Sequence, residues 1–567
     1  MMTVLTGIGV GSTAAAGPCV QFTPPVNAPT DEAVPSGPEQ LATATEAIRS
    51  ALGKVCAELS AAAEVNAGQT LGDVLAATAE MASDPEYAEL AIGHLATHGP
   101  ANALTVATEE FATMFRAIGG YMAERVADLN SVRDRAVAHI LGVESGGLAE
   151  LTEPAVVVAH ELTPADTSGL DMSKVIALVT EVGGPTSHTA IIARQLGLPC
   201  VVKVDGATTV PAGTVLAVDG ARGQVIVDPD ERTLAAIQER MERYARLLDD
   251  DRPGATSDGH PVQLLANIGT TADARAAASQ PVEGIGLFRT EFMFLDSDQE
   301  PCIEVQTEAY REVLSAFAGR KVVVRTLDAG ADKPLAYANL SIEANPALGQ
   351  RAYRLVRSVP HLMAHQLTAL AQAIDACPNT ETWVMAPMIS TATEAADFMA
   401  RAEAAGLGGK ARIGIMVEVP AAALCADEVL STVQFASIGT NDLAQYTMAT
   451  DRELGALADL IDRWQPAVLR LVAQTAEAGQ RTATPVGVCG ESASDPLMAL
   501  VLVGMGITSL SMSTASIPAV RFALRHTSLE TCQQMARAAL GAADSTEAVS
   551  AVQNLLNEEV RQAMALE

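Results

Sequence analysis

The spacing of hydrophobic residues predicts strands and then helices in the first quarter of the chain. Between residues 39 and 141, apolar residues recur every three and four positions among Ala, Leu, Glu and Arg, which is typical of amphipathic helices. Because no run of β-branched residues interrupts this pattern, we predict an all-α segment of about four helices. Before it, residues 3–22 favour short strands separated by glycines, and a proline-rich connector occupies residues 23–38.

Short apolar runs of strand length replace the helical pattern from residue 155 onward. Between residues 155 and 230, we also predict one helix, at residues 189–196. Residues 231–248 then form an amphipathic, charged pattern that ends at three aspartates and Pro253, which indicates a linker helix. The predicted strands before that helix are residues 155–158, 175–179, 200–202, 215–218 and 225–227.

Eight further apolar runs alternate with helical stretches in the rest of the chain. Eight β-α repeats in one segment favour a TIM barrel. Since barrel enzymes place their chemistry at the C-terminal ends of the strands, polar residues there are candidate site residues. The predicted barrel strands are residues 262–267, 284–288, 321–326, 383–387, 412–417, 435–438, 485–489 and 507–511.

Composition and charge exclude several classes of protein. The 567 residues are 49% hydrophobic with a positive mean hydropathy, which excludes global disorder. A net charge of −32 argues against a nucleic-acid or membrane-surface partner. The eight cysteines form no C-x-x-C pair, which favours reduced thiols and a cytoplasmic location. Glycines interrupt the uncharged residues 1–30 and 496–520, so neither segment is expected to be a signal peptide or a membrane span.

The run Gly-Gly-Pro-Thr-Ser-His at residues 183–188 places a histidine beside the start of a predicted helix. Its two glycines permit a tight turn. The free amides and positive dipole of a helix N-terminus would stabilise a phosphoryl group there. His188 is therefore suited to be a nucleophile that becomes phosphorylated. For an isolated histidine, a ring that merely caps the turn or packs is the more common outcome.

Four arginines after or near the predicted barrel strands are candidate anion ligands. Arg289 and Arg325 directly follow buried strands, while Arg351 and Arg452 lie in connecting segments. Guanidinium groups bind carboxylate and phosphate oxygens in pairs, so arginines that meet at the barrel mouth suit a compact polyanion. Taken singly, each arginine fits a surface or salt-bridged position better.

Two carboxylates at neighbouring strand ends are candidate metal ligands. Glu418 and Asp442 follow consecutive predicted strands, and Asn441 precedes Asp442. Without histidine or thiolate ligands, such a pair fits Mg²⁺ better than zinc. A structural carboxylate pair satisfied by Lys or Arg explains the spacing equally well. Cys489 ends the seventh predicted strand, where a thiol could protonate an enolate carbon, although a free cysteine is usually just buried.

These segments together resemble Enzyme I of the bacterial phosphotransferase system, a family of phosphoenolpyruvate-utilising enzymes. Residues 183–194 are similar to the family's phosphohistidine signature, although Pro185 stands where many relatives have arginine. In the run at residues 161–167, Thr167 would lie beside the histidine. Residues 437–446, continuing to Asp451-Arg452, are similar to a second and more specific family signature. The likeness weakens in the helical segment, where residues 76–79 depart from the family pattern.

The resemblance implies a multidomain α/β fold with a definite domain order. A split phosphohistidine swivel domain would occupy residues 1–22 plus 145–230, and an all-α insert that binds the phosphocarrier HPr would occupy residues 23–144. A linker helix at residues 231–253 would lead to a C-terminal (β/α)8 TIM barrel at residues 254–567. This barrel would bind phosphoenolpyruvate and form a homodimer.

The resemblance also implies the reaction, the first step of sugar uptake by this system. Phosphoenolpyruvate would phosphorylate His188 and leave as pyruvate, and the phosphoryl group would pass to a histidine of HPr. Cys489 would be the proton donor, and Glu418 and Asp442 would hold Mg²⁺. The phosphoenolpyruvate ligands would be Arg289, Arg325, Arg351, Asn441, Asp442 and Arg452.

Two alternatives remain open at this point. Pyruvate phosphate dikinases and phosphoenolpyruvate synthases share the histidine domain and the barrel, but they resemble longer chains with an ATP-binding domain. No glycine-rich nucleotide loop occurs in the first 150 residues here. The second alternative is a non-catalytic regulator that senses phosphoenolpyruvate, against which the presence of all the candidate catalytic residues argues.

Overall fold

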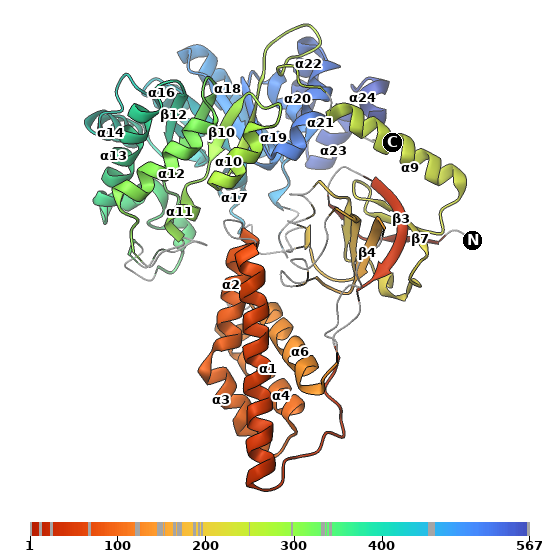
Figure 1. Ribbon diagram of the computed structural model, residues 1–567. Coiled ribbons are helices and arrows are strands. Elements are labelled where there is room, and N and C mark those ends of the chain that lie inside the picture. The colour runs from red at the N-terminus through yellow and green to blue at the C-terminus, as the bar shows by residue number, and fades with distance from the viewer. Residues whose placement is uncertain are drawn as a thin grey trace. The chain divides into compact units, whose positions relative to one another are not determined.

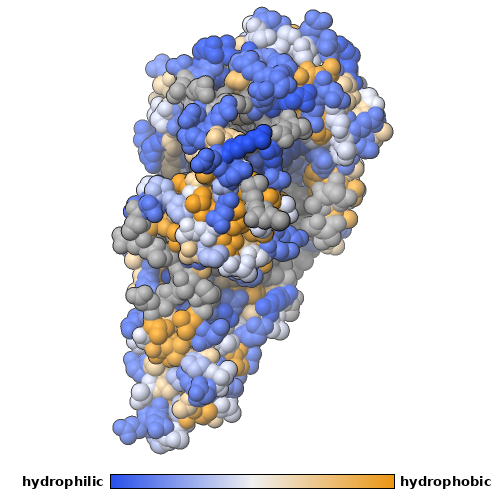
Figure 2. All heavy atoms as spheres, turned by 90° about the vertical axis from the view of Figure 1, so that its right-hand side faces the viewer, coloured by the Kyte–Doolittle hydropathy of each residue, from blue (hydrophilic) through white to orange (hydrophobic). Residues whose placement is uncertain are grey.

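The chain divides into two compact units, Met1–Arg243 and Tyr244–Glu567, in the computed structural model (Figure 1). Hydrophilic side chains cover much of the face that Figure 2 shows, as expected for a chain with this surplus of charge. The structure describes residues 3–10, 14–22, 26–65, 70–118, 125–143, 151, 153–162, 166, 173–184, 189, 190, 193, 197–248, 250–295, 299–329, 335, 337, 338, 343–451, 457 and 460–563.

An eight-stranded sheet in the first unit draws its strands from two separate parts of the chain. The order is β1-β8-β7-β3-β4-β5-β6-β2, and the pairs from β3 to β6 are parallel. This confirms the strands predicted at both ends of the helical segment. Of the helix predicted at residues 189–196, the structure describes residues 189, 190 and 193, all helical. The strands are β1 (Thr3–Thr6), β2 (Ile8–Val10), β3 (Ala14–Gln21), β4 (Ala155–Ala159), β5 (Val175–Thr180), β6 (Cys200–Val202), β7 (Val215–Asp219) and β8 (Gln224–Val227).

The predicted helical segment is present between β3 and β4, and its described residues form five α-helices rather than about four. The extra boundary lies at Asp84, whose carboxylate accepts a hydrogen bond from the Glu86 amide, while Pro85 occupies the first helical turn. Fully buried apolar side chains such as Ile48 and Leu104 hold the helices together. The helices are α1 (Pro38–Val65), α2 (Thr70–Ser83), α3 (Pro85–Gly93), α4 (Pro100–Ile118) and α6 (Val126–Leu141).

The predicted charged helix is α9 (Glu231–Leu248), and it contains the boundary between the two units. The helices of the described residues include no candidate for a membrane-spanning segment. The uncharged residues 496–520 instead form a helix, a turn and a strand. The boundaries of the swivel domain, the insert and the linker stay a prediction.

Eight parallel strands close into a barrel in the second unit, which confirms the TIM-barrel prediction. Alternation within each strand sends one set of side chains outward under the helices and the other into the barrel interior, where Leu287, Trp383 and Phe435 pack together. The strands are β9 (Gln263–Ile268), β10 (Gly284–Phe288), β11 (Lys321–Arg325), β12 (Glu381–Ala386), β13 (Arg412–Val417), β14 (Ala436–Gly439), β15 (Val486–Cys489) and β16 (Ser509–Met512).

The helices outside the barrel follow the strands in sequence, and short helices open several of the loops. The longer helices are α10 (Thr271–Ala278), α12 (Ile303–Ala316), α13 (Pro360–Ala376), α14 (Ala392–Ala404), α17 (Thr440–Met448), α18 (Pro466–Thr482), α20 (Pro496–Gly504), α21 (Ile517–Arg525), α22 (Leu529–Gly541) and α23 (Ser545–Gln553). The short ones are α11 (Glu291–Leu295), α15 (Pro420–Leu424), α16 (Ala426–Leu430), α19 (Glu491–Ser494) and α24 (Glu558–Ala563).

Candidate functional site

Buried polar side chains gather at the C-terminal ends of the barrel strands, an end we call the barrel mouth. Arg325 is the last residue of β11, and Cys489 is the last residue of β15. Glu418 follows β13 directly, and Asp442 lies in the first turn of α17, immediately after β14. Arg289 follows β10 directly. Parallel strands in a closed barrel therefore bring these distant positions to one end.

Two carboxylates hold the guanidinium of Arg325, which is only 7% exposed. Its Nη2 donates to Oε1 of Glu291 at 2.7 Å, and its Nη1 lies 3.3 Å from Oδ2 of Asp328. Burial alone would lower the pKa of Arg325, but the charges of Glu291 and Asp328 outweigh it and raise the pKa. The guanidinium is therefore permanently charged and fixed in orientation.

Arg351 completes a second ion-pair network around the same aspartate. Its Nη2 lies 3.0 Å from both carboxylate oxygens of Asp328, and its Nη1 lies 3.1 Å from Oδ1 of Asp442. The same Nη1 donates to the Tyr446 hydroxyl at 3.1 Å. Asp328 thus bridges Arg325 and Arg351, two of the arginines that the sequence predicts to bind one anion.

Glu418 is fully buried, and its two carboxylate oxygens have different surroundings. Oε1 accepts the Met388 amide hydrogen at 2.6 Å, whereas Oε2 has no hydrogen-bond partner among the described residues. Burial raises the pKa of Glu418 to about 8, and the charges of Asp442 and Asp328 add to that rise. A Cβ atom at Gly439 would lie 2.8 Å from Oε2, so only glycine keeps this space open.

These features fit a hard divalent cation. The ionised form of a buried carboxylate is stabilised by a nearby positive charge, which a cation at the unpaired oxygen would provide. Oxygen ligands of this kind suit Mg²⁺. Within the described residues, no group of three or more His, Cys, Asp or Glu side chains could hold a metal. Glu418 and Asp442 would therefore supply two ligands, and water and substrate oxygens would supply the others.

Cys489 is held as a neutral thiol inside the mouth. It is 2% exposed, and its Sγ donates to the Ile438 carbonyl at 3.5 Å. Burial raises the pKa of Cys489, and the charge of Glu418 acts in the same direction. Contact with Ser437 and the charges of Arg325 and Arg289 lower it in part. A buried thiol that keeps its proton can act as an acid.

The backbone after Cys489 brings Asn441 to the same place. Gly490 has a φ of 108°, a conformation that L residues with side chains rarely adopt. A Cβ atom there would lie 3.3 Å from Oδ1 of Asn441. Glycine therefore allows β15 and the start of α17 to approach closely.

The structure brings together most of the predicted site residues. Arg325, Arg351, Glu418, Asp442 and Cys489 form one cluster. The charge of Arg289 acts on Cys489, and Asn441 lies against Gly490.

Sequence reasoning missed three members of the cluster, although each of them stands close to a residue that the sequence analysis singled out. Glu291 lies two residues after Arg289, Asp328 ends the run Arg-Thr-Leu-Asp, and Tyr446 lies one helical turn after Asp442.

Predicted residues His188, Arg452 and Thr167 lie outside the described residues, as does Pro185. The next described residue after His188 is Thr189, which is 3% exposed. Its hydroxyl donates to the Leu162 carbonyl at 3.3 Å. This bond anchors the chain directly after His188 to the segment that follows β4.

Three descriptions of phosphoenolpyruvate-utilising enzymes match the chain. The PEP-binding domain of these enzymes matches residues 245–529, which include every strand of the barrel. Their mobile domain matches residues 151–223, and their N-terminal part matches residues 6–125.

Proteins of high sequence identity carry one common name, phosphoenolpyruvate-protein phosphotransferase. The protein of that name from Streptomyces coelicolor is 46% identical over 99% of this chain and 100% of its own. Its namesake from Staphylococcus carnosus is 40% identical over 80% of this chain and 81% of its own. The Haloferax volcanii protein is 40% identical over 84% of this chain and 85% of its own. The chain therefore belongs to the phosphoenolpyruvate-protein phosphotransferase family.

Proposed function

We propose that this transferase takes the phosphoryl group of phosphoenolpyruvate onto His188 and passes it to a histidine of the phosphocarrier HPr. The observation that carries the proposal is the barrel mouth, where two buried arginines are held by three carboxylates in a domain that matches the PEP-binding domain of the family. Phosphoenolpyruvate is a compact anion with a carboxylate and a phosphate, so it suits this arrangement.

Substrate binding requires the mouth arginines to exchange partners. Arg325 and Arg351 are held by Glu291, Asp328 and Asp442. These carboxylates keep the guanidinium groups oriented, so little reorganisation is needed when the substrate oxygens replace them. Arg289, Asn441 and Arg452 are proposed to complete the substrate ligands.

Glu418 and Asp442 are proposed to hold Mg²⁺, which when bound neutralises charge on the phosphoryl group. Glu418 must ionise to serve as a ligand, and the cation supplies the positive charge that its buried oxygen lacks. Asp442 already pairs with Arg351, so the metal ligand and the substrate ligand are adjacent.

Cys489 is proposed to finish the first transfer. The bond between phosphorus and the enol oxygen breaks as a bond to an imidazole nitrogen of His188 forms. The enolate that leaves takes a proton at carbon from the Cys489 thiol and departs as pyruvate, and solvent then returns a proton to the thiolate. The raised pKa of Cys489 suits this role because the thiol still carries its proton near neutral pH.

The second transfer takes the phosphoryl group from His188 to HPr. The helical insert at residues 23–144 is the proposed docking surface, and α9 within residues 231–253 is the proposed hinge. A cytoplasmic homodimer formed through the barrel completes this proposal. Support for a protein acceptor comes from the name that the relatives share.

A labelling assay tests this function. Incubation with phosphoenolpyruvate labelled in its phosphate and with Mg²⁺ should label the chain, and adding HPr should move the label to HPr. His188→Ala should abolish labelling, whereas His160→Ala, a control at an exposed histidine of the same unit, should retain it. Labelling by ATP in place of phosphoenolpyruvate would favour a dikinase. Tight phosphoenolpyruvate binding without any transfer would favour a regulator.

A further inference from the structure

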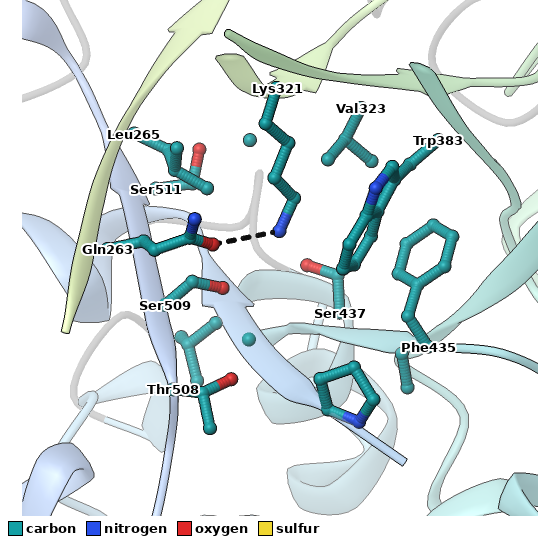
Figure 3. A pocket seen from close by; sticks show the side chains of 15 residues that line it. Gln263, Leu265, Lys321, Val323, Trp383, Phe435, Ser437, Thr508, Ser509 and Ser511 are labelled. Atoms are coloured by element: carbon teal, nitrogen blue, oxygen red, sulfur yellow. Dashed lines mark hydrogen bonds between the residues drawn. The ribbon is translucent and has the colours of Figure 1, made fainter. Parts of the chain in front are cut away.

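A cavity of about 40 Å³ lies inside the barrel at the N-terminal ends of its strands, opposite to the mouth. We call it the lower pocket (Figure 3). TIM barrels usually fill this region with layers of side chains. Here Gly286 and Gly487 have no side chain to place inside the barrel. A Cβ atom at Gly286 would overlap the Ser511 hydroxyl, and one at Gly487 would overlap the Ser509 hydroxyl. Small residues therefore leave the lower end of the barrel partly unfilled.

Lys321, the first residue of β11, points into the lower pocket (Figure 3). The residue is 6% exposed, and its Nζ lies 3.5 Å from the centre of the Trp383 ring. Its one hydrogen bond within the described residues goes to Oε1 of Gln263 at 3.2 Å. An ammonium group has three donors, so the ring and one amide leave it incompletely satisfied.

No carboxylate pairs with this buried cation among the described residues. Glu381 acts on Lys321 only through its charge, and its Oε1 accepts the indole hydrogen of Trp383 at 2.9 Å. Arg412 adds a second positive charge, 5.1 Å from the same ring. Burial lowers the pKa of Lys321 to about 8, with Arg412 adding to the effect and Glu381 opposing it. A buried ammonium group without a carboxylate partner is unfavourable, so an anion bound in the pocket would stabilise charged Lys321.

We propose that the lower pocket binds a small aliphatic monocarboxylate, whose carboxylate pairs with Lys321. One ammonium group matches one negative charge, and Lys321 is the only cation that lines the pocket as the described residues form it, so one carboxylate suits it better than a phosphate dianion. Ser509 also lines the pocket, and in this proposal its hydroxyl donates to the carboxylate. Leu265, Val323 and Phe435 offer an apolar surface for a short carbon chain.

This site is distinct from the mouth that binds phosphoenolpyruvate. Lys321 and Arg325 occupy opposite ends of β11. Four residue steps of a strand separate them by roughly 13 Å. The proposal therefore stands or falls independently of the proposed function.

The fluorescence of Trp383 tests the proposal in the full chain. The chain has two tryptophans, so Trp464→Phe leaves Trp383 as the reporter. Formate, acetate and propionate, titrated at constant ionic strength and about pH 6.5 without Mg²⁺, should each change the emission saturably, with propionate binding tightest. Lys321→Met should abolish the response. Lys410→Met, at an exposed lysine of the same unit, should not change it.

A pH series needs no change at Lys321 and therefore does not depend on the folding of that variant. Glu381 and Arg412 are the charged groups that act on Lys321. Between about pH 6.5 and 9.5, deprotonation of Lys321 should weaken propionate binding roughly 30-fold. Constant affinity across the range would overturn the proposal. So would an unchanged response in Lys321→Met, displacement of propionate by phosphoenolpyruvate, or tighter binding of inorganic phosphate.

Discussion

At the scale of single residues, the arginines at the mouth have several carboxylate partners each, whereas Glu418 has few partners. Arg325 and Arg351 share Asp328, so the arginines are paired more than once. Glu418 differs, because one of its buried oxygens has no hydrogen-bond partner in the part of the chain that the structure describes. A site of this kind favours an incoming cation at Glu418 together with an incoming anion at the arginines.

Glu418→Gln should weaken the use of Mg²⁺ without disturbing the fold. The glutamine oxygen can still accept the Met388 amide hydrogen, but it has lost the charge that binds the metal. We expect the Mg²⁺ concentration for half-maximal labelling to rise and the labelling rate to fall, the latter roughly 100-fold. Labelling rates measured across a Mg²⁺ titration check this. Glu304→Gln, at an exposed position of α12, is the control, and an equal response in both variants would contradict the ligand assignment.

The same variant should change how stability depends on pH in the absence of metal. The pKa of Glu418 rises from 4.5 to about 8 on folding, so the folded chain binds this proton more tightly than the unfolded chain does. Its contribution to stability is therefore lost progressively as the pH rises through that window. Glutamine does not titrate. In the presence of a chelator, the melting temperature of Glu418→Gln relative to the unmodified chain should be higher at pH 8 than at pH 5. A difference between the two melting temperatures that stays constant with pH would contradict the raised pKa of Glu418.

Cys489→Ala should separate phosphorylation from protonation of the enolate. The variant keeps the arginines and the carboxylates, so a single turnover should still label His188. Steady-state pyruvate formation should fall roughly 100-fold because the acid is missing. Rapid-quench and steady-state assays measure the two steps, with Cys425→Ala, an exposed cysteine on the same unit, as the control. Normal turnover of Cys489→Ala would remove the proposed role.

At the scale of elements, the carboxyl ends of the strands set the site, and glycines set their spacing. The end of β14 passes so close to Glu418 that Gly439 has no room for a side chain. The eight barrel strands were predictable because they are short, largely apolar runs, and strands such as β10 and β11 are buried along their whole length. The ion pairs between the strand ends were not predictable. Asp328 meets Asp442 through Arg351 only after the barrel closes, and no spacing in the sequence encodes that.

Sequence reasoning also overlooked Lys321, for a related physical reason. A lysine at the start of a strand is usually exposed, and its burial here depends on Trp383 from β12 and Gln263 from β9. In the helical segment, the sequence pattern likewise predicted the helices but not all of their boundaries. Its periodicity was clear, but the break at Asp84-Pro85 divides it more finely than the spacing alone suggests.

Gly439→Ala tests whether that close approach supports the site. The added methyl group would lie within 3 Å of both Oε2 of Glu418 and Cε of Met416, so it should displace the carboxylate. We expect roughly tenfold or greater loss of Mg²⁺-dependent labelling. Gly541→Ala is the matched control, because a Cβ atom there meets nothing within 4 Å. Equal activity in the two variants would show that the space beside Glu418 is dispensable.

At the scale of the whole molecule, the acidic surplus extends into the barrel mouth. The chain carries −32 overall, and at the mouth the buried arginines are paired with the carboxylates of Glu291, Asp328 and Asp442. Residues 23–144 contain 17 acidic and 6 basic side chains, a net charge of −11. If that segment docks HPr through opposite charges, salt should slow transfer to HPr more than labelling by phosphoenolpyruvate. Transfer rates measured at about 50 and about 500 mM salt check this, and equal salt effects would contradict it.

Peptide-level mass spectrometry after a brief incubation with phosphoenolpyruvate and Mg²⁺ tests the central claim most directly. The account predicts one phosphoryl group, carried by the peptide that contains His188, and its loss when HPr is added. It also predicts that Arg325→Met abolishes this modification while His160→Ala leaves it unchanged. Phosphate on any other residue, or on His188 with Arg325 replaced, would contradict transfer from the barrel mouth to this histidine.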